Sequence, residues 1–577
     1  MGYHLWSQSR RLYGKLAEKS FLYKAPPFAD HVELFFFVYA CYLLQFQLDL
    51  GIDRNFMLMP ILLSLIVVLH IIRGTRWQLY PLYIMLLLLF LWRSKSPLAY
   101  TTQVILLVLS ALLSILFPMI PRFLPHRDTD NIGVQDFCLR APMIGPGSEF
   151  WIKLYYPCKA HQYKLPRAYW LQIGVVLLFI VALAVTNFSF LKSAYFLAFI
   201  LVHIYFEAIE YYCKLPSSDY MPDNKLSHIG LARYMKLPSI LFSHLSFNTL
   251  CCYEDAEPLP ATNQLRVVFV LHGLSGLRTS YSALCMRLAS EGYLVVSPEF
   301  GDGTPAVTVL PDNHRFYEPF VGKPATVEEH LFRHTQLQHR QVELNTIMQF
   351  LDLLNRDITS SGKLALVFAS MCRTVRWRLH GPLVNSAFVD QIGGKIDING
   401  VDLIGHSFGA ATALYCSTSS HESSVEFRDK YKIRSVVLYD PWMYPLSDNL
   451  REGKNNEILH YPILCMHAQY FQWAKNLEFE TSVIKRAKAL SIQLRFNDAG
   501  HVNYTELGFV NPFLGYRLGS VGKQDPEDLL FEICDLTVSF LKLLTKDELT
   551  ETNLIAENIQ DRIEKMANLC NLLHFSS

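Results

Sequence analysis

Charged residues are scarce in this chain. Only 18% of its 577 residues are Asp, Glu, Lys or Arg, whereas 51% are hydrophobic, and the mean hydropathy is +0.18. This composition is too apolar for a single soluble domain and predicts segments embedded in a membrane. The net charge of +1 gives no reason to expect a nucleic-acid partner.

Several signals of other protein classes are also missing. The sequence has no internal repeat, no glycine-rich loop for phosphate and no cluster spaced like metal ligands. Its 12 cysteines lack the spacing of a disulfide framework, which favours a reducing compartment. We therefore expect neither a metal nor a cofactor. A long basic and aromatic tail precedes the first apolar run, so we expect no cleavable signal peptide.

The apolar residues gather in six runs, at about residues 32–50, 57–72, 79–92, 104–120, 169–190 and 194–212. The first four are each near the length that crosses a bilayer, and they follow one another closely. They predict about four transmembrane helices within residues 32–121, after a basic tail at 1–31. The last two predict a membrane hairpin within 169–213, which either crosses the bilayer or dips into it.

The most informative short motif is Gly405-His406-Ser407-Phe408-Gly409. It has the G-x-S-x-G form of a nucleophile elbow, in which a serine lies on a tight turn between a strand and a helix. An apolar run precedes it and small, helix-forming residues follow, as this turn requires. Ser407 is therefore the candidate nucleophile, and the N–H of Phe408 would face a developing oxyanion.

Candidates for an acid and a base follow the serine in the order that this elbow expects. Asp440 ends the strand-like run 435–439, and His501 follows the strand-like run 491–496. The carboxyl ends of parallel strands lie at one edge of a sheet, so these side chains can meet Ser407 there. Asp498 is a rival acid in the loop of His501 itself, whereas Asp402 lies within a strand and should point away.

A second N–H for the oxyanion comes from an earlier turn. The run 266–271 ends in His272-Gly273-Leu274, which can aim the amide of Leu274 at the same point as that of Phe408. We interpret His272 as a structural hydrogen-bonding residue because it precedes the serine. A helix-length segment and another strand-like run follow, which predicts a βαβ unit and a parallel sheet.

Taken in order, these motifs resemble the platelet-activating factor acetylhydrolases of the plasma and intracellular type II kind. The resemblance covers about residues 131–158 and 216–545. The matching segments are 132–136, 153–157, His272-Gly273-Leu274, 278–282, 405–409, Asp440-Pro441-Trp442, 469–473 and His501-Val502-Asn503. It implies an α/β-hydrolase fold and a serine-dependent phospholipase of the A2 type. It also implies a phospholipid substrate with a short or oxidised sn-2 acyl chain, and no metal.

The resemblance assigns the same roles to the candidate residues. Ser407 becomes the nucleophile, Asp440 the acid and His501 the base, while Leu274 and Phe408 supply the oxyanion amides. The expected fold is then an α/β-hydrolase, with a mostly parallel sheet flanked by helices, fused to an all-α multispan membrane region. The hydrolase starts in residues 122–168, is interrupted at 169–213 and continues through 214–577.

The distribution of Lys and Arg predicts the orientation of this multi-pass protein. Basic residues gather in the tail, in the loop at 73–77 and in the 122–168 segment. Because basic loops remain on the cytosolic side, we expect the hydrolase to face the cytosol. The bilayer and a phospholipid are the expected partners, whereas the organelle and any protein partner stay open.

Two sets of alternatives remain at this point. The same three residues could serve a longer-chain phospholipase, a lysophospholipase or an acyltransferase. The chain could also be a membrane transporter or scaffold with a degenerate hydrolase attached.

Other segments predict secondary structure outside the site. Residues 331–355 and 529–544 predict helices that cover a sheet, and the tail after Lys546 predicts a peripheral helix. Residues 216–260 fit either a lid or ordinary core packing, and 356–393 are an excursion of unknown role.

Overall fold

The structure is a computed structural model that describes residues 132–141, 148–159 and 217–576, together with scattered positions between 80 and 113. The gaps within 217–576 are 261–263, 312, 357–387, 389–390, 419–426, 447–458, 472, 510–511 and 545–569. The chain divides into two compact units, Met1–Leu116 with Val175–Ile204 and Phe117–Gly174 with Tyr205–Ser577. All the strands and helices described below belong to the second unit.

The predicted membrane segments fall almost entirely outside the described residues. Within the part of the chain that the structure describes, no helix has the length and apolar character needed to cross a bilayer. The spans expected at 32–121 and 169–213 therefore stay predictions. The excursion at 356–393 also lies mostly outside the described residues.

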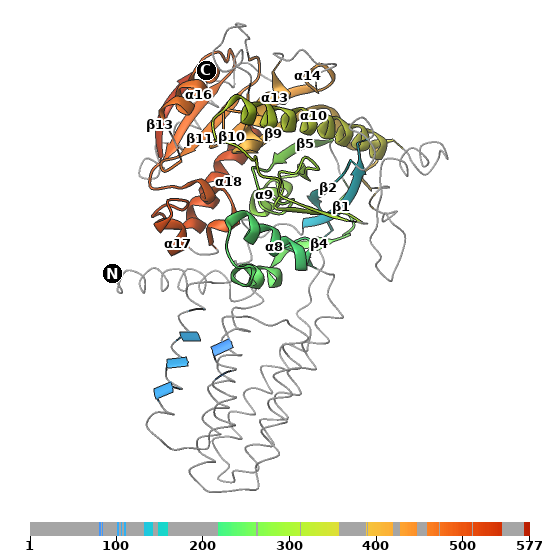
Figure 1. The fold of residues 1–577 in the computed structure, drawn as a ribbon. Helices are drawn as coiled ribbons and strands as arrows, with labels where there is room; N and C mark the ends of the chain where they lie inside the picture. The colour runs from blue at the N-terminus through green and yellow to red at the C-terminus, as the bar shows by residue number, and fades with distance from the viewer. Residues whose placement is uncertain are drawn as a thin grey trace, which may run out of the picture. The chain divides into compact units, whose positions relative to one another are not determined.

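The second unit is built on one eleven-stranded mixed sheet (Figure 1). Its six central strands are parallel to one another. In spatial order they are β6 (Leu294–Glu299), β5 (Leu265–Leu271), β9 (Ile396–His406), β10 (Lys432–Tyr439), β11 (Ile463–Ala468) and β12 (Ser491–Phe496). The sequence predicted the apolar runs of β5, β6, β9, β10 and β12 as strands but missed that of β11, and the parallel βαβ unit around 266–297 is confirmed.

The order of these strands creates a point where the direction of winding reverses. The chain passes from β5 through α9 (Ser282–Ala289) to β6, then returns through α10 (Val327–Asn355) to β9 on the other side of β5. From β9 it continues outward to β10, β11 and β12. In an open α/β sheet, ligands bind beyond the carboxyl ends of the strands at such a reversal. Ser407 directly follows β9, at that point.

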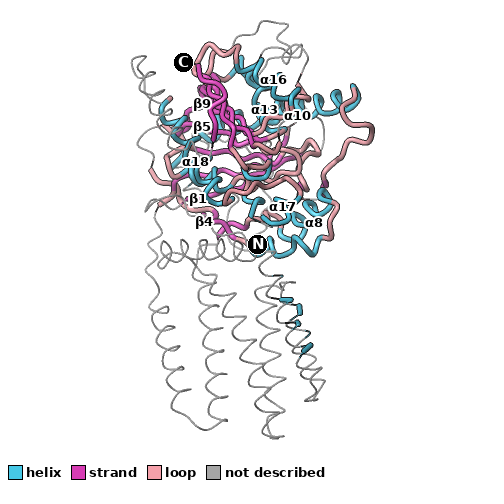
Figure 2. The backbone as a smooth tube through the Cα atoms, turned by 90° about the vertical axis from the view of Figure 1, so that its left-hand side faces the viewer, coloured by secondary structure: helices cyan, strands magenta, loops and turns pink. Residues whose placement is uncertain are grey.

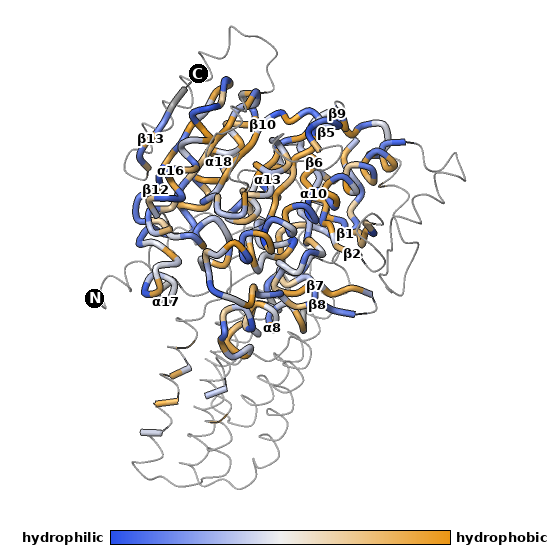
Figure 3. Tube along the Cα trace, turned by 45° about the horizontal axis from the view of Figure 1, so that its top comes forward, coloured by the Kyte–Doolittle hydropathy of each residue, from blue (hydrophilic) through white to orange (hydrophobic). Residues whose placement is uncertain are grey.

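Helices cover both faces of the sheet, which is why its strands are apolar on both sides. Along β5, Val268 and Val270 join a core that includes α9 and α18 (Pro526–Leu543). Val267 and Phe269 join the opposite core, which includes α10 and α13 (Phe408–Ser417). Figure 2 shows the strands enclosed by these helices, and Figure 3 shows hydrophobic residues gathered along the central strands and α13.

Antiparallel strands extend the sheet at one end. They are β2 (Glu149–Pro157), β1 (Ile132–Arg140), β4 (Thr249–Glu254) and β3 (Ser217–Asp219), with β1 and β4 parallel to each other. The first two contain the 132–136 and 153–157 segments. Short helical segments lie between β3 and β4, namely α8 (Asn224–Met235) and η3 (Ser239–Phe247). Leu231 and Leu245 pack in the core, whereas Met235 and Ile240 are exposed, so part of this region is core packing.

The other end of the sheet differs from the sequence prediction. The tail after Lys546 was expected to form a peripheral helix, but residues Cys570–Ser576 form β13, which pairs antiparallel with β12. The prediction was wrong for this segment because an open sheet edge, rather than local periodicity, decides whether a chain end pairs there. The helices expected at 331–355 and 529–544 are confirmed as α10 and α18.

Candidate active site

Ser407 lies on a strained turn between β9 and α13. Its φ of 57° and ψ of −116° fall in a region that residues with side chains rarely adopt. The flanking glycines are required sterically. A Cβ added to Gly405 would lie 2.2 Å from the Gly409 carbonyl oxygen, and one added to Gly409 would lie 2.1 Å from that of Leu271. The G-x-S-x-G motif therefore folds as the tight elbow that its sequence predicts.

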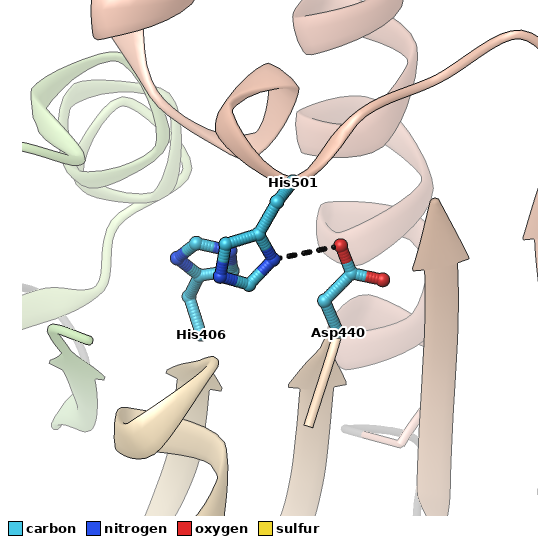
Figure 4. Close-up of side chains that lie close together, drawn as sticks. All are labelled: His406, Asp440 and His501. Carbon is cyan, nitrogen blue, oxygen red and sulfur yellow. Dashed lines mark hydrogen bonds and ion pairs between the residues drawn. The ribbon is translucent and has the colours of Figure 1, made fainter. Parts of the chain in front are cut away.

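Asp440 directly follows β10 and is completely buried. Its Oδ1 accepts a hydrogen bond of 2.6 Å from the N–H of Ala468, and its Oδ2 lies 3.0 Å from Nδ1 of His501 (Figure 4). The next turn is tied to the elbow, since the N–H of Trp442 donates to the carbonyl of Ser407 at 3.2 Å. The carboxylate is thus held at the carboxyl edge of the sheet.

His501 begins the short helix η4 (His501–Tyr504) after β12, and its side chain keeps 24% exposure. One face of the imidazole stacks on Phe471, with ring centroids 3.6 Å apart. The ring of His406 is also close, at 4.3 Å between centroids, and Figure 4 shows the two imidazoles side by side. Because His406 immediately precedes Ser407, the imidazole of His501 lies beside the elbow.

The contact with Asp440 fixes which nitrogen of His501 is available. Nδ1 donates to the carboxylate, so Nε2 keeps its lone pair in the neutral ring. Burial lowers the pKa of His501 to about 3. The ring is therefore neutral at pH 7 and able to accept a proton.

The turn after β5 packs against the serine. A Cβ added to Gly273 would lie 3.1 Å from Cβ of Ser407, so the backbone leading into Leu274 passes directly beside the elbow. Phe408 is the first residue of α13, and its N–H is one of the four that an α-helix leaves without an intrahelical partner. Phe408 thus follows the serine in the chain, and Gly273, the residue before Leu274, lies against it in space.

His272 has the structural environment that the sequence suggested. It is fully buried, with Nδ1 2.7 Å from the Gly273 carbonyl oxygen, and its Nε2 accepts from the N–H of Phe300 at 3.3 Å. Burial, aided by the positive charge of Arg340, lowers its pKa to about 3. A neutral, enclosed ring of this kind braces the turn.

The two rival acids are engaged elsewhere. Asp402 receives two hydrogen bonds of 2.5 Å from Arg266 and one of 2.6 Å from Ser435, within the sheet. Asp498 accepts a hydrogen bond of 2.6 Å from the hydroxyl of Tyr470. Asp440 is the carboxylate that contacts His501.

Two positioning residues escaped the sequence interpretation. Arg340 of α10 is completely buried; it donates to the carbonyl of His272 at 2.9 Å and pairs with Asp302 at 2.7 Å. Its place on the apolar stripe of its helix, between Leu337 and Leu344, was an available signal.

Tyr281, the second of these residues, bridges two parts of the site. Its hydroxyl accepts from the N–H of Gly273 at 3.3 Å and lies 2.8 Å from Nδ1 of His406.

Among the described residues, two groups bring three possible metal ligands within 4.8 Å of one another. One is His406, Asp440 and His501, in which Asp440 and His501 already bond each other. The other is Cys465, His467 and Glu480, which the sequence interpretation overlooked. Its members come from a strand and the following helix, so their spacing matches no metal-binding motif. The nine described cysteines are all free thiols.

Comparison with known proteins gives a family match. The family described as platelet-activating factor acetylhydrolase, isoform II, matches residues 192–563, well over half of the chain. A platelet-activating factor acetylhydrolase of Gallus gallus is 23% identical over 330 residues, which are 54% of this chain and 69% of that protein. A putative phospholipase A2 of Schizosaccharomyces pombe is 28% identical over 196 residues, 32% of this chain and 43% of its own.

These matches are partial in length. The aligned part covers 59% to 69% of three vertebrate relatives. Among solved structures, the ferulic acid esterase from Streptomyces cinnamoneus is 12% identical, with a TM-score of 0.46, and covers 78% of this chain and 98% of its own. That score is too low to support an argument, so the α/β-hydrolase-like fold is assigned from the strand order and the elbow.

Proposed function

Since this chain belongs to the platelet-activating factor acetylhydrolase isoform II family, we propose that it hydrolyses the sn-2 ester of phospholipids with a short or oxidised acyl chain. The nucleophile is Ser407. The observation that carries the proposal is the 3.0 Å contact between His501 and Asp440, beside a strained serine elbow at the reversal point of the sheet. A general base oriented by a carboxylate next to an activated serine is the arrangement that ester hydrolysis needs.

The reaction follows from the availability of Nε2. The Ser407 hydroxyl attacks the ester carbonyl carbon and passes its proton to Nε2 of His501, while Asp440 stabilises the imidazolium that forms. The N–H groups of Leu274 and Phe408 stabilise the oxyanion. When the intermediate collapses, the lysophospholipid oxygen leaves with the proton from His501. Water then attacks the acyl-serine with His501 again as base, which releases the fatty acid and restores the enzyme.

Labelling with a fluorophosphonate probe tests the catalytic part of this proposal. Wild-type protein should be labelled, and Ser407→Ala should not be. Ser417→Ala, another buried serine of α13, is the matched control and should label like the wild type. An unlabelled wild-type protein would leave the transporter or scaffold alternative standing.

The substrate is tested separately with phospholipids that share one headgroup and differ only at sn-2. The proposal predicts that an acetyl chain is released faster than a palmitoyl chain, and that Ser407→Ala releases neither. Faster release of the long chain would support the second candidate, a longer-chain phospholipase. Transfer of the acyl group to an added lysophospholipid instead of water would identify an acyltransferase.

The proposal includes attachment to a membrane, with the catalytic unit on the cytosolic side. It is supported by the apolar runs within 32–121 and 169–213 and by the concentration of Lys and Arg in the 1–31 tail and the 122–168 segment. An anchored enzyme stays beside substrates that reside in the bilayer. Protease added to the lumenal side of sealed vesicles should leave residues 214–577 intact, and digestion there would reverse the orientation. Release of the whole chain by an alkaline wash would contradict anchoring.

A further inference from the structure

A second cluster of reactive side chains lies behind the acid of the candidate site. Cys465 and His467 are two residues apart on β11, so their side chains share one face of the sheet. Glu480 reaches them from α16 (Ala474–Ile484), and Gln493 from β12. All four residues are buried, with at most 2% exposure. The cluster has no part in the proposed ester hydrolysis.

The polar atoms of this cluster converge on a single point. Oε1 of Glu480 lies 2.6 Å from Nε2 of His467 and 2.8 Å from Sγ of Cys465, and those two atoms are 3.8 Å apart. Nε2 of Gln493 lies 2.9 Å from Nε2 of His467 and 3.0 Å from Oε1 of Glu480. Four side chains from three elements thus meet within a volume that excludes solvent.

Two features of this arrangement are unfavourable in a buried site. With a proton on Nε2, His467 donates to Glu480, and the nitrogen of the Gln493 amide then lies 2.9 Å from a second donor instead of an acceptor. The second carboxylate oxygen of Glu480, Oε2, has no hydrogen-bond partner among the described residues. A donor that faces a donor and a carboxylate oxygen without a partner are both costly where solvent is excluded, and a bound cation would relieve both.

The donor atoms match the preferences of a borderline-soft divalent cation. Thiolate, imidazole and carboxylate are the protein ligands of Zn²⁺, at about 2.3 Å for sulfur and about 2.0–2.2 Å for nitrogen and oxygen. Tetrahedral coordination at those lengths separates sulfur from nitrogen by roughly 3.5 Å, close to the 3.8 Å found between Cys465 and His467. The Glu480 oxygen sits nearer than this geometry requires, and a retreat of less than about 1 Å would accommodate the ion.

We propose that Cys465, His467 and Glu480 form a structural zinc site, with Gln493 as the fourth ligand. A half turn of the Gln493 amide presents its oxygen in place of its nitrogen. On binding, the Cys465 thiol releases one proton, and the thiolate and the Glu480 carboxylate together neutralise the two charges of the ion. His467 binds through the lone pair of neutral Nε2. This charge balance is what a site without solvent needs.

The site would brace the loop that carries the acid of the candidate triad. Asn476 of α16 lies one helical turn before Glu480. Its Nδ2 donates to the Pro441 carbonyl at 2.8 Å, and its Oδ1 accepts from the N–H of Met443 at 2.9 Å. The N–H of Ala468, the residue after His467, donates to Asp440 itself. An ion that joins α16 to β11 would therefore hold in place the two elements that contact Asp440 and the loop after it. This role does not depend on which ester the enzyme cleaves.

Metal titration of the purified full-length chain tests the proposal. After dialysis against a chelator, the protein should bind one equivalent of Zn²⁺. One equivalent of Co²⁺ should produce the near-ultraviolet absorption of a cobalt–thiolate bond. Cys465→Ser should abolish that absorption and weaken Zn²⁺ binding by at least about 100-fold, and Glu480→Gln by about 10- to 100-fold.

Two controls locate the ion. His501→Gln should bind the metal as the wild type does, because the His406, Asp440 and His501 group is not the site. Cys416→Ser, which alters a buried thiol of α13, should also leave the cobalt absorption unchanged. The proposal would be overturned if the wild type bound less than one equivalent of Zn²⁺. It would also be overturned if the cobalt absorption persisted in Cys465→Ser or disappeared in His501→Gln.

A measurement on the wild-type protein avoids dependence on the folding of variants. X-ray absorption at the zinc edge of the loaded protein should show one sulfur ligand and nitrogen or oxygen ligands completing the shell. A shell without sulfur would refute the site. The zinc-loaded wild type should also unfold at a higher temperature than the metal-free protein, and an equal unfolding temperature would count against a structural ion.

Discussion

Two pairs of carboxylate and histidine lie at neighbouring strands of one sheet, and their surroundings differ. Asp440 and His501 meet at the carboxyl edge, where the Asp440 side chain is fully buried and that of His501 is 24% exposed. Glu480 and His467 meet inside the sheet-and-helix layer, and both side chains are completely buried. The first histidine lies beside a serine elbow, whereas the second lies beside a thiol. Both pairs combine a carboxylate with an imidazole, so their different proposed roles, catalysis and metal binding, follow from where each pair lies in the fold.

The protonation of the two histidines differs in the same way. Burial lowers the pKa of His501 to about 3, which keeps the ring neutral and basic at pH 7. Burial also acts against charge on His467, but the Glu480 carboxylate outweighs it and raises the pKa of that ring. A base that must take a proton from a serine works best when neutral. We therefore expect substitutions at the first pair to remove activity, and substitutions at the second to affect mainly stability and metal binding.

The largest difference should appear when each histidine is replaced by glutamine. His501→Gln removes the proposed base and should lower kcat by about 10⁶-fold, as in serine hydrolases whose base is deleted. His467→Gln should lower kcat by less than about tenfold, because its ring does not reach substrate. Steady-state kinetics on one phospholipid with both variants checks this. If kcat fell by a similar factor in the two variants, the proposal that only the first pair is catalytic would be wrong.

The acids should differ by a smaller factor. Asp440→Asn leaves the geometry in place but favours the wrong tautomer of His501, and should lower kcat by about 10⁴-fold with little change in KM. Glu480→Gln has the same change in charge and size and serves as its matched control. It should keep kcat within about tenfold. If Asp440→Asn retained most of its activity, another group would have to orient the imidazole.

A third buried ion pair tests whether burial alone makes a residue important for stability. Arg340→Met leaves Asp302 without its cation and frees the carbonyl of His272, so the free energy of unfolding should fall by about 3–5 kcal/mol. Arg356→Ala removes an ion pair of the same helix whose arginine side chain is 60% exposed, and should cost less than about 0.5 kcal/mol. Urea denaturation measures both. Equal losses would mean that the Arg340 network does not brace the turn.

The sequence carried most of what locates the candidate site. Continuous apolar runs predicted β5, β9, β10 and β12, because parallel strands buried on both faces need such runs. The order of Ser407, Asp440 and His501 along the chain then brought them to one edge. The structure brings Asp440 and His501 into contact and sets His501 beside the elbow. The helical spacing in 331–355 similarly predicted α10.

The remaining features depend on contacts that a sequence does not display. β13 forms because β12 presents an open edge. The hydrophobic pattern of residues 570–576 alone does not predict this strand. Arg340 was missed because its partners Asp302 and the His272 carbonyl come from other elements. The group of Cys465, His467 and Glu480 depends on how α16 packs on β11, which spacing along the chain cannot reveal.

The pH profile should show the smallest effect and sharpen the comparison of the two histidines. The base must be neutral, so kcat/KM should fall only as the pH drops through the pKa of His501 in the free enzyme. Because burial lowers that pKa, activity should hold constant from pH 8 to well below pH 6.5, the ordinary value for histidine. A profile that loses half its activity near pH 6.5 or above would mean that burial does not govern this ring.

The central claim is that Ser407 and His501 act as one unit at the elbow. It is tested most directly by comparing Ser407→Ala, His501→Ala and the double variant in ester hydrolysis. If the two side chains share one step, the double variant should be no slower than either single variant, since the second change removes nothing that still functions. Losses that multiply in the double variant would show that the serine and the histidine act independently, and would contradict the account.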